Sequence, residues 1–188
     1  MDIGKARLRV DAVSRRAGLS AEQQAAAGEA LVRAVRPLAI GRVAAYASVG
    51  TEPDTTALLA DLDDVLLPVL LPDGELDWAV HDGTLVPGPR GLREPAGRRL
   101  GRDAVADCAV VVVPALAVDR TGVRLGRGGG SYDRTLGRTT AYVVTALHVG
   151  ELVAALPAEP HDRPVHAAVL PDLGLVRLRA YEPGGMGR

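Results

Sequence analysis

The sequence predicts an α/β domain with three layers, in which a mostly parallel central sheet carries helices on both faces. Two observations favour this architecture. Short apolar segments rich in valine alternate along the chain with segments whose apolar residues have helical spacing. The most apolar of them, CAVVVVPALAV at residues 108–118, is typical of a strand buried on both faces, so we place it at the centre of the sheet.

A chain of 188 residues is long enough to bury a core of its own. It contains neither an internal repeat nor a linker that would divide it. We therefore expect a single domain over residues 1–188, with N-terminal helices within 1–36 and a frayed tail at 184–188.

The composition argues against several classes of protein. The formal net charge of -1 offers no basic surplus for nucleic acid. No apolar stretch approaches the roughly 18 residues of a membrane span, and the charged N-terminus lacks the features of a signal peptide. The single cysteine, Cys108, excludes an intrachain disulfide. We expect a cytoplasmic protein without membrane or nucleic-acid partners, and a monomer because no exposed apolar stripe stands out.

In the first half of the chain, helix signals precede strand signals. Two N-terminal helices are expected, and Ser20 with Gln23 forms the capping-box pattern that begins the second. The apolar segment 42–49 is bounded by glycines and predicts a strand, after which Asp54 is suited to cap a helix. Further strands are expected at 64–71 and 75–80.

In the second half, residues 83–101 are rich in glycine and proline and predict a long loop. A helix is expected from Ser131, and a short helix at 150–156. The remaining expected strands are 140–147, 166–170 and 175–181.

Residues 124–134, RLGRGGGSYDR, contain the densest glycine cluster of the chain. Glycines at 126, 128, 129 and 130 would let backbone N–H groups approach an anion closely, and the start of the following helix adds further free N–H groups. Arg124 and Arg127 carry planar charged groups suited to phosphate, and Asp133 could hold Mg²⁺ beside it. The stretch therefore predicts a phosphate-binding loop.

Other interpretations of this loop stay open. It lacks the lysine of a Walker A loop and the glycine spacing of a dinucleotide-binding loop, so neither nucleotide class is supported by motif. A glycine cluster can also be a flexible connection with exposed arginines. The histidines at 148, 161 and 166 show no trusted metal-ligand spacing, and with one cysteine we expect no zinc site.

The segment VPALAVDRTGVRLGRGGGSYDRTL at 113–136 resembles the signature of the 5-formyltetrahydrofolate cyclo-ligase family. Four further blocks resemble that family in the same order: KARLR at 5–9, YASVGTEPDT at 46–55, GLREP at 91–95 and PHDRPVH at 160–166. The resemblance implies a Rossmann-like fold of the sugar-phosphate isomerase and CoA-transferase type. It also implies an enzyme that uses ATP and Mg²⁺ to convert 5-formyltetrahydrofolate to 5,10-methenyltetrahydrofolate.

The resemblance also implies roles for individual residues. Arg127 and Lys5 are the implied catalytic residues, and Asp133 and Asp162 the implied Mg²⁺ ligands. Lys5 and Arg9 are four residues apart and would face the phosphates from one side of the first helix. The implied ATP-binding residues are Lys5, Arg9, Arg124, Leu125, Gly126, Arg127, Gly128, Gly129, Gly130, Ser131 and Tyr132.

The folate pocket is implied to contain Glu52, which matches the family residue that binds the pterin. A carboxylate can accept hydrogen bonds from two neighbouring N–H groups of that ring. The other implied substrate residues are Ala47, Trp78 and Arg127. For Trp78, simple packing in the core is the alternative.

Three positions depart from the family pattern. Gly129 stands where the family has a lysine, Ser131 where it has a tyrosine, and Val118 where it has an aromatic residue. Two rival hypotheses therefore remain beside the cyclo-ligase: a folate- or nucleotide-binding module that has lost catalysis, and a related α/β enzyme that acts on a phosphorylated metabolite.

Overall fold

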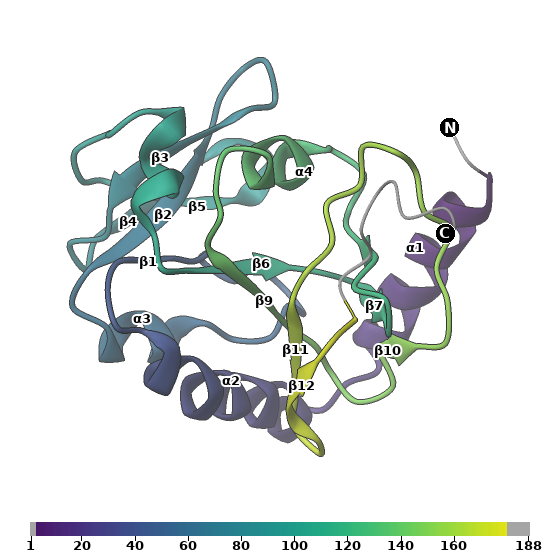
Figure 1. The fold of residues 1–188 in the computed structure, drawn as a ribbon. Coiled ribbons are helices and arrows are strands. Elements are labelled where there is room, and N and C mark those ends of the chain that lie inside the picture. Colours follow the sequence, from purple (N-terminus) through teal and green to yellow (C-terminus); the bar gives the residue numbers. More distant parts are fainter. Residues whose placement is uncertain (1–2, 180–188) are drawn as a thin grey trace.

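The computed structural model describes residues 3–179, which form a three-layer α/β fold around a seven-stranded sheet (Figure 1). Five neighbouring strands run parallel, and one antiparallel strand closes each edge. The predicted architecture is thereby confirmed. In spatial order the strands are β12 (Gly174–Arg177), β11 (Ala167–Leu170), β9 (Tyr142–Ala146), β6 (Val110–Pro114), β1 (Val43–Ala44), β2 (Val65–Leu70) and β3 (Leu76–Val80).

Helices cover both faces of this sheet. On one face lie α2 (Ala21–Val35) and α3 (Thr56–Asp61), and on the other α4 (Ser131–Leu136) and the 3₁₀ helix η3 (Arg102–Asp107) (Figure 1). A second 3₁₀ turn, η1 (Arg36–Leu38), continues α2. The predicted capping box is present, since Ser20 Oγ accepts the Gln23 N–H and the Gln23 side chain accepts the Ser20 N–H. No helix within residues 3–179 has the length and apolar character needed to cross a bilayer.

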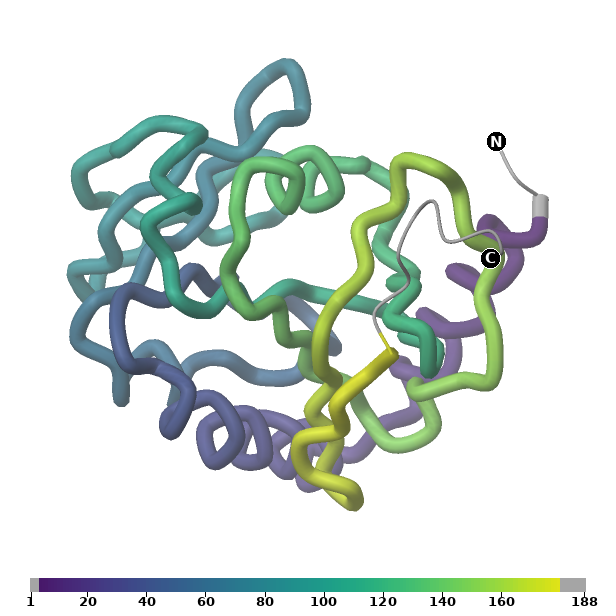
Figure 2. The backbone as a smooth tube through the Cα atoms, in the orientation of Figure 1, coloured from purple at the N-terminus to yellow at the C-terminus, as the bar shows by residue number. Residues whose placement is uncertain are grey.

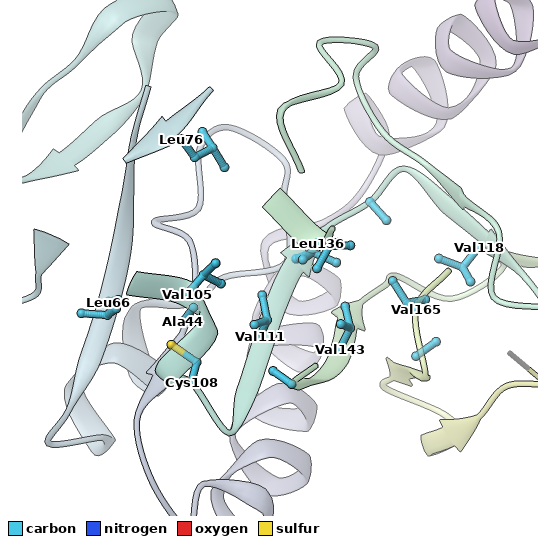
Figure 3. Close-up of a cluster of buried hydrophobic side chains, with 14 of the residues drawn as sticks. Ala44, Leu66, Leu76, Val105, Cys108, Val111, Val118, Leu136, Val143 and Val165 are labelled. Atoms are coloured by element: carbon cyan, nitrogen blue, oxygen red, sulfur yellow. The ribbon is translucent and has the colours of Figure 1, made fainter. Parts of the chain in front are cut away.

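The strand β6 joins the two halves of the core. Val110 and Val112 pack with α2 and α3, whereas Val111 and Val113 pack on the opposite face. Figure 3 shows Val111 in that second cluster, near Leu136 of α4 and Val143 of β9. Burying one such valine side chain contributes roughly 1.5–3 kcal/mol. The expectation of a central strand buried on both faces is therefore confirmed for residues 110–114.

The helix α1 (Ile3–Ala17) does not cover the main sheet. It packs through Ala12 against a small second sheet of β10 (Leu152–Val153), β7 (Ala117–Asp119) and β8 (Arg124–Leu125), at one side of the molecule (Figure 1). The predicted strand 108–118 is consequently two strands, because the chain leaves the main sheet after Pro114 and enters the small sheet at Ala117.

Two predictions about the connections were wrong. Residues 83–101 contain the hairpin β4 (Leu85–Pro87) and β5 (Arg93–Pro95), joined by the turn η2 (Pro89–Gly91). The expected helix at 150–156 is instead β10, which pairs in parallel with β7. A helix of seven residues has little stability of its own, so pairing with a neighbouring strand prevails.

Boundaries also shifted. The expected strand 42–49 shortens to the two residues of β1, and α3 begins at Thr56, with Thr55 as the cap position. Asp54 still caps this end through its side chain, since Asp54 Oδ1 accepts the Thr56 N–H at 2.9 Å. The end of the strand expected at 175–181 and the tail at 184–188 lie outside the described residues.

Two histidines lie within the fold. His148, at 2% exposure, follows β9, and Glu151 and Arg16 face it; His166 precedes β11 and accepts the Val143 N–H at Nδ1. Burial lowers the pKa of both side chains. Both are therefore neutral at pH 7, whereas in the unfolded chain each would bind a proton below about pH 6.5.

We accordingly expect the free energy of unfolding to fall as the pH decreases from about 6.5, since the unfolded state then binds more protons than the folded one. Urea unfolding between pH 5 and 8 measures this slope. The variant His148→Gln should show a smaller loss than the wild type. Equal slopes in wild type and His148→Gln would contradict the expectation.

Candidate functional site

Three loops meet at the end of the sheet where its parallel strands finish. Residues 45–55 follow β1, residues 147–151 follow β9, and residues 126–130 join β8 to α4. The glycine loop therefore follows β8, a strand of the small sheet. The central strand β6 does not lead directly into it. It still reaches the main-sheet loops, because its Arg127 contacts Glu52.

The glycine loop needs glycine at three positions. Gly128 and Gly130 have positive φ angles of 98° and 69°, which other residues rarely adopt. A Cβ atom at Gly126 would lie 2.8 Å from Arg124 Nη1. Gly129 differs, because its backbone carries no such restriction and a Cβ there would meet only Ser131 Oγ, at 3.6 Å. A Cβ atom is therefore accommodated at 129.

Arg124 is buried and bonded within the protein. Its Nη1 donates to the Pro114 carbonyl at 3.1 Å, and its Nη2 lies 3.1 Å from Asp133 Oδ1. Its guanidinium also lies over the Tyr132 ring, 5.7 Å from the centroid. Burial raises the pKa of the Tyr132 hydroxyl, which stays neutral. The Leu125 side chain packs in the core with Ala12, so only its backbone is placed to reach a ligand.

Arg127 is the cation of the loop that solvent can reach. Its side chain is 61% exposed, and its Nη2 lies 3.2 Å from Oε1 of Glu52, whose side chain is only 8% exposed. The other oxygen of Glu52 accepts the Val49 N–H at 3.0 Å. The structure thus brings together the two residues to which the sequence had assigned the pterin and the formyl group.

The two predicted cations of α1 reach different neighbours. Arg9 Nε donates to the Gly126 carbonyl at 2.8 Å, so Arg9 supports the glycine loop directly. Lys5 Nζ lies 2.7 Å from both Glu159 Oε2 and Asp162 Oδ2 (the segments are side by side in Figure 2). Burial disfavours the charged amine, but the hydrogen bonds to Asp162 and Glu159 outweigh it and raise the pKa of Lys5. Lys5 is therefore charged at pH 7.

The two predicted metal ligands come from adjoining segments, since Asp133 Oδ1 accepts the N–H of Arg163, the residue after Asp162, at 3.3 Å. Asp133 Oδ1 is engaged with Arg124, and Asp162 Oδ2 with Lys5, while Asp162 Oδ1 lies 3.9 Å from His161 Nε2. Within residues 3–179, Asp133 Oδ2 and Asp162 Oδ1 accept no hydrogen bond. Hard oxygen ligands of this kind fit Mg²⁺.

A second group with metal-ligating atoms overlaps this one. Ligand atoms of Glu159, His161 and Asp162 lie within 4.8 Å of one another. Neither Glu159 nor His161 was predicted from the sequence to be a metal ligand. The Lys5 ammonium already bonds two of these carboxylates, so the group is balanced by a cation of the protein itself.

The remaining substrate candidates are placed less directly. Ala47 is half-buried between β1 and the loop that carries Glu52. Trp78, on β3, has 0% exposure and belongs to the core, where its Nε1 has no hydrogen-bond partner among the described residues. In this structure the Trp78 ring therefore offers no surface to a ligand. It packs in the core, which was the alternative to a role in the folate pocket.

A buried polar chain beneath the site was not found from the sequence. Arg16 Nε lies 2.7 Å from Glu151 Oε1, Glu151 Oε2 accepts the His148 N–H at 2.8 Å, and His148 Nε2 lies 3.0 Å from the Thr51 carbonyl. These residues are distant along the chain, and charged residues are rarely fully buried unless they are paired. No local pattern marks them.

Known proteins resemble this chain over most of its length. A model of the 5-formyltetrahydrofolate cyclo-ligase family matches residues 2–171. The 5-formyltetrahydrofolate cyclo-ligase of Mycolicibacterium smegmatis is 44% identical over 73% of this chain and 77% of that protein. The enzyme of the same name from Escherichia coli K12 is 34% identical over 84% of this chain and 94% of that protein.

Solved structures give the same result. The 5,10-methenyltetrahydrofolate synthetase of Aquifex aeolicus superposes with a TM-score of 0.80 at 28% identity, covering 95% of this chain and 94% of that one. A synthetase of that name from Mycoplasma pneumoniae shares the fold, with a TM-score of 0.67 at 18% identity over 89% of this chain and 98% of that one. Because the family model spans most of the sequence and two relatives exceed 30% identity, this chain belongs to the 5-formyltetrahydrofolate cyclo-ligase family.

Proposed function

We propose that this protein converts 5-formyltetrahydrofolate to 5,10-methenyltetrahydrofolate in the cytoplasm, as a monomer, with ATP and Mg²⁺ as its cofactors. ADP and phosphate are released. The observation that carries the proposal is the ion pair between Arg127 and Glu52, at 3.2 Å, which joins the glycine loop to the loop that matches the family's pterin residue. The family membership supports the same reaction.

The chemistry sets what the protein must supply. A formamide carbon is a poor electrophile, so the formyl oxygen first attacks the γ-phosphorus of ATP and ADP leaves. Nitrogen 10 then attacks the activated carbon and loses its proton to solvent, and loss of phosphate completes the new ring. The protein mainly has to align the γ-phosphate with the formyl oxygen and stabilise negative charge on the transferring group.

Glu52 and Arg127 serve the folate side of this reaction. Glu52 is nearly buried and held by the Val49 N–H, so its position is set before the pterin arrives. Its carboxylate accepts hydrogen bonds from two N–H groups of the ring. Arg127 is exposed enough to exchange Glu52 for the phosphate and formyl oxygens when both substrates are bound.

The ATP side is formed by the glycine loop and α1. The loop's backbone N–H groups and Arg127 face the phosphates, while Arg9 holds the loop through the Gly126 carbonyl and Lys5 adds positive charge. Asp133 and Asp162 would hold Mg²⁺ through their unbonded oxygens. When bound, the ion neutralises phosphate charge during transfer.

The test measures methenyl product and ADP with purified protein, 5-formyltetrahydrofolate, ATP and Mg²⁺. We expect turnover that a chelator abolishes. Arg127→Ala should lower kcat by roughly 10²–10³, as expected for loss of a charged donor to the transferring group. Arg36→Ala is the matched control, since Arg36 is also an exposed arginine in an ion pair, with Asp61, but lies away from the site. Absence of product with wild-type protein, or full activity in Arg127→Ala, would contradict the proposal.

Gly129 favours one second candidate, a protein that binds the same ligands without turnover. The family's lysine is missing there, and one phosphate-neutralising charge with it. Calorimetry separates the two candidates, because the binding protein takes up ATP and folate without forming product.

Restoring the lysine should strengthen ATP use by the enzyme. Because a Cβ at 129 meets only Ser131 Oγ, at 3.6 Å, we expect Gly129→Lys to fold and to raise kcat/KM for ATP about 10- to 100-fold, as for a hydrogen bond from a charged donor. Gly129→Met, of similar length and uncharged, is the control. Equal effects of lysine and methionine would show that charge at this position is irrelevant.

A further inference from the structure

The loop that carries Glu52 is closed at its base by its own residues. Ser48 N–H donates to Thr55 Oγ1 at 3.0 Å, and Thr55 N–H donates to Ser48 Oγ at 3.2 Å. At the tip, Val49 and Glu52 bond to each other through backbone and side chain. Within residues 3–179, one hydrogen bond from outside this loop reaches the backbone of residues 49–52. It joins the His148 side chain to the Thr51 carbonyl.

The protonation state of His148 follows from its partner. A carbonyl oxygen only accepts, so His148 Nε2 carries the proton and donates to Thr51 at 3.0 Å. The other ring nitrogen, Nδ1, is then an acceptor, and it is buried without a partner among the described residues. A buried unpaired acceptor lowers the stability of the protein, whereas an apolar side chain of the same shape would avoid this loss. Packing alone does not account for a histidine here.

The histidine is held in turn by an ion pair that is almost completely buried. Arg16 and Glu151 are 2% and 3% exposed, with two contacts between them at 2.7 and 2.8 Å. Arg16 Nη2 also donates to the Ala115 carbonyl at the end of β6, and Glu151 accepts the His148 backbone N–H. The pair therefore fixes the turn 148–151 to α1 and to the end of the central strand.

We propose that His148 is a positioning residue for substrate binding: its Nε2–H holds the Thr51 carbonyl, and so sets the position of Glu52 against the pterin. Arg16 and Glu151 hold His148 in place. The role of Glu52 in this inference rests on the proposed function. The contact between His148 and Thr51 does not depend on it. Part of the affinity for folate therefore depends on a network of buried residues that do not themselves contact the substrate.

The test compares two donor-free variants, His148→Phe and His148→Leu, with His148→Gln, whose amide N–H replaces the donor. Either donor-free variant, whichever folds, should raise KM for 5-formyltetrahydrofolate about 2- to 10-fold, the worth of one hydrogen bond, and leave KM for ATP unchanged. Hydrogen exchange of the amides at 49–52 should become faster. His148→Gln should restore most of both values.

Two controls separate positioning from general stability. His166→Phe removes the histidine that accepts the Val143 N–H before β11, away from the site, and should lower Tm without changing KM for folate. The double variant His148→Phe with Glu52→Gln should have the folate KM of Glu52→Gln alone, because both changes act through one contact. Equal changes in folate KM for His148→Phe and His166→Phe would overturn the proposal.

The outcomes also distinguish this inference from the proposed function. If Glu52→Gln leaves KM for folate unchanged, or the wild type shows no turnover, the role of Glu52 fails while exchange at 49–52 still reports on His148. If Glu52→Gln raises KM but the donor-free variants change neither KM nor exchange at 49–52, the positioning role of His148 fails and the proposed function stands.

Discussion

Two buried guanidinium groups hold the end of the central strand, and the arrangement of the site depends on them. The chain leaves the main sheet after Pro114, and at this point the carbonyls of Pro114 and Ala115 accept hydrogen bonds from arginine side chains. Arg124 donates to the first and Arg16 to the second. Buried carbonyls without partners would be costly, so both arginines are needed where the strand ends. Arg124 then bonds Asp133, a proposed Mg²⁺ ligand, and Arg16 bonds Glu151, which holds the His148 N–H.

The glycines of the loop have a second role beside these arginines. A Cβ at Gly126 would lie 2.8 Å from Arg124 Nη1, one at Gly130 would lie 2.9 Å from Arg134 Nη1, and one at Gly128 would lie 3.3 Å from Arg9 Cζ. The sequence suggested that side chains are missing so that a phosphate can approach. In the structure the same absence first makes room for guanidinium groups of the protein, of which Arg124 is paired with Asp133 and Arg134 with Glu75.

Features that depend on residues close together in the sequence were predicted correctly, whereas features that depend on tertiary contacts were not. The β6 core and the capping box of α2 are set by neighbouring residues, so pattern and spacing were sufficient. Within the segment 150–156, residues 152–153 form the strand β10 because they pair with β7. No residue of the segment indicates this pairing. In the site, Arg127 and Glu52 were each found from family-like blocks. Their contact, and the chain from Arg16 to Thr51, depend on tertiary structure and could not be read from spacing.

Three of the four candidate phosphate cations, Arg124, Lys5 and Arg127, are paired with acids before any ligand arrives, and their burial decides which can change partner. Arg124 with Asp133 and Lys5 with Asp162 are ion pairs with a buried cation, and breaking such a pair leaves an unbalanced charge away from water. Arg127 is 61% exposed, so water screens its pair with Glu52 and solvates the guanidinium as it turns. In the proposed reaction, this exchange would also free the Glu52 carboxylate to accept the pterin N–H groups. Arg127 is therefore the cation suited to move between substrate-free and loaded states, while Arg124 and Lys5 keep the loops in register around it.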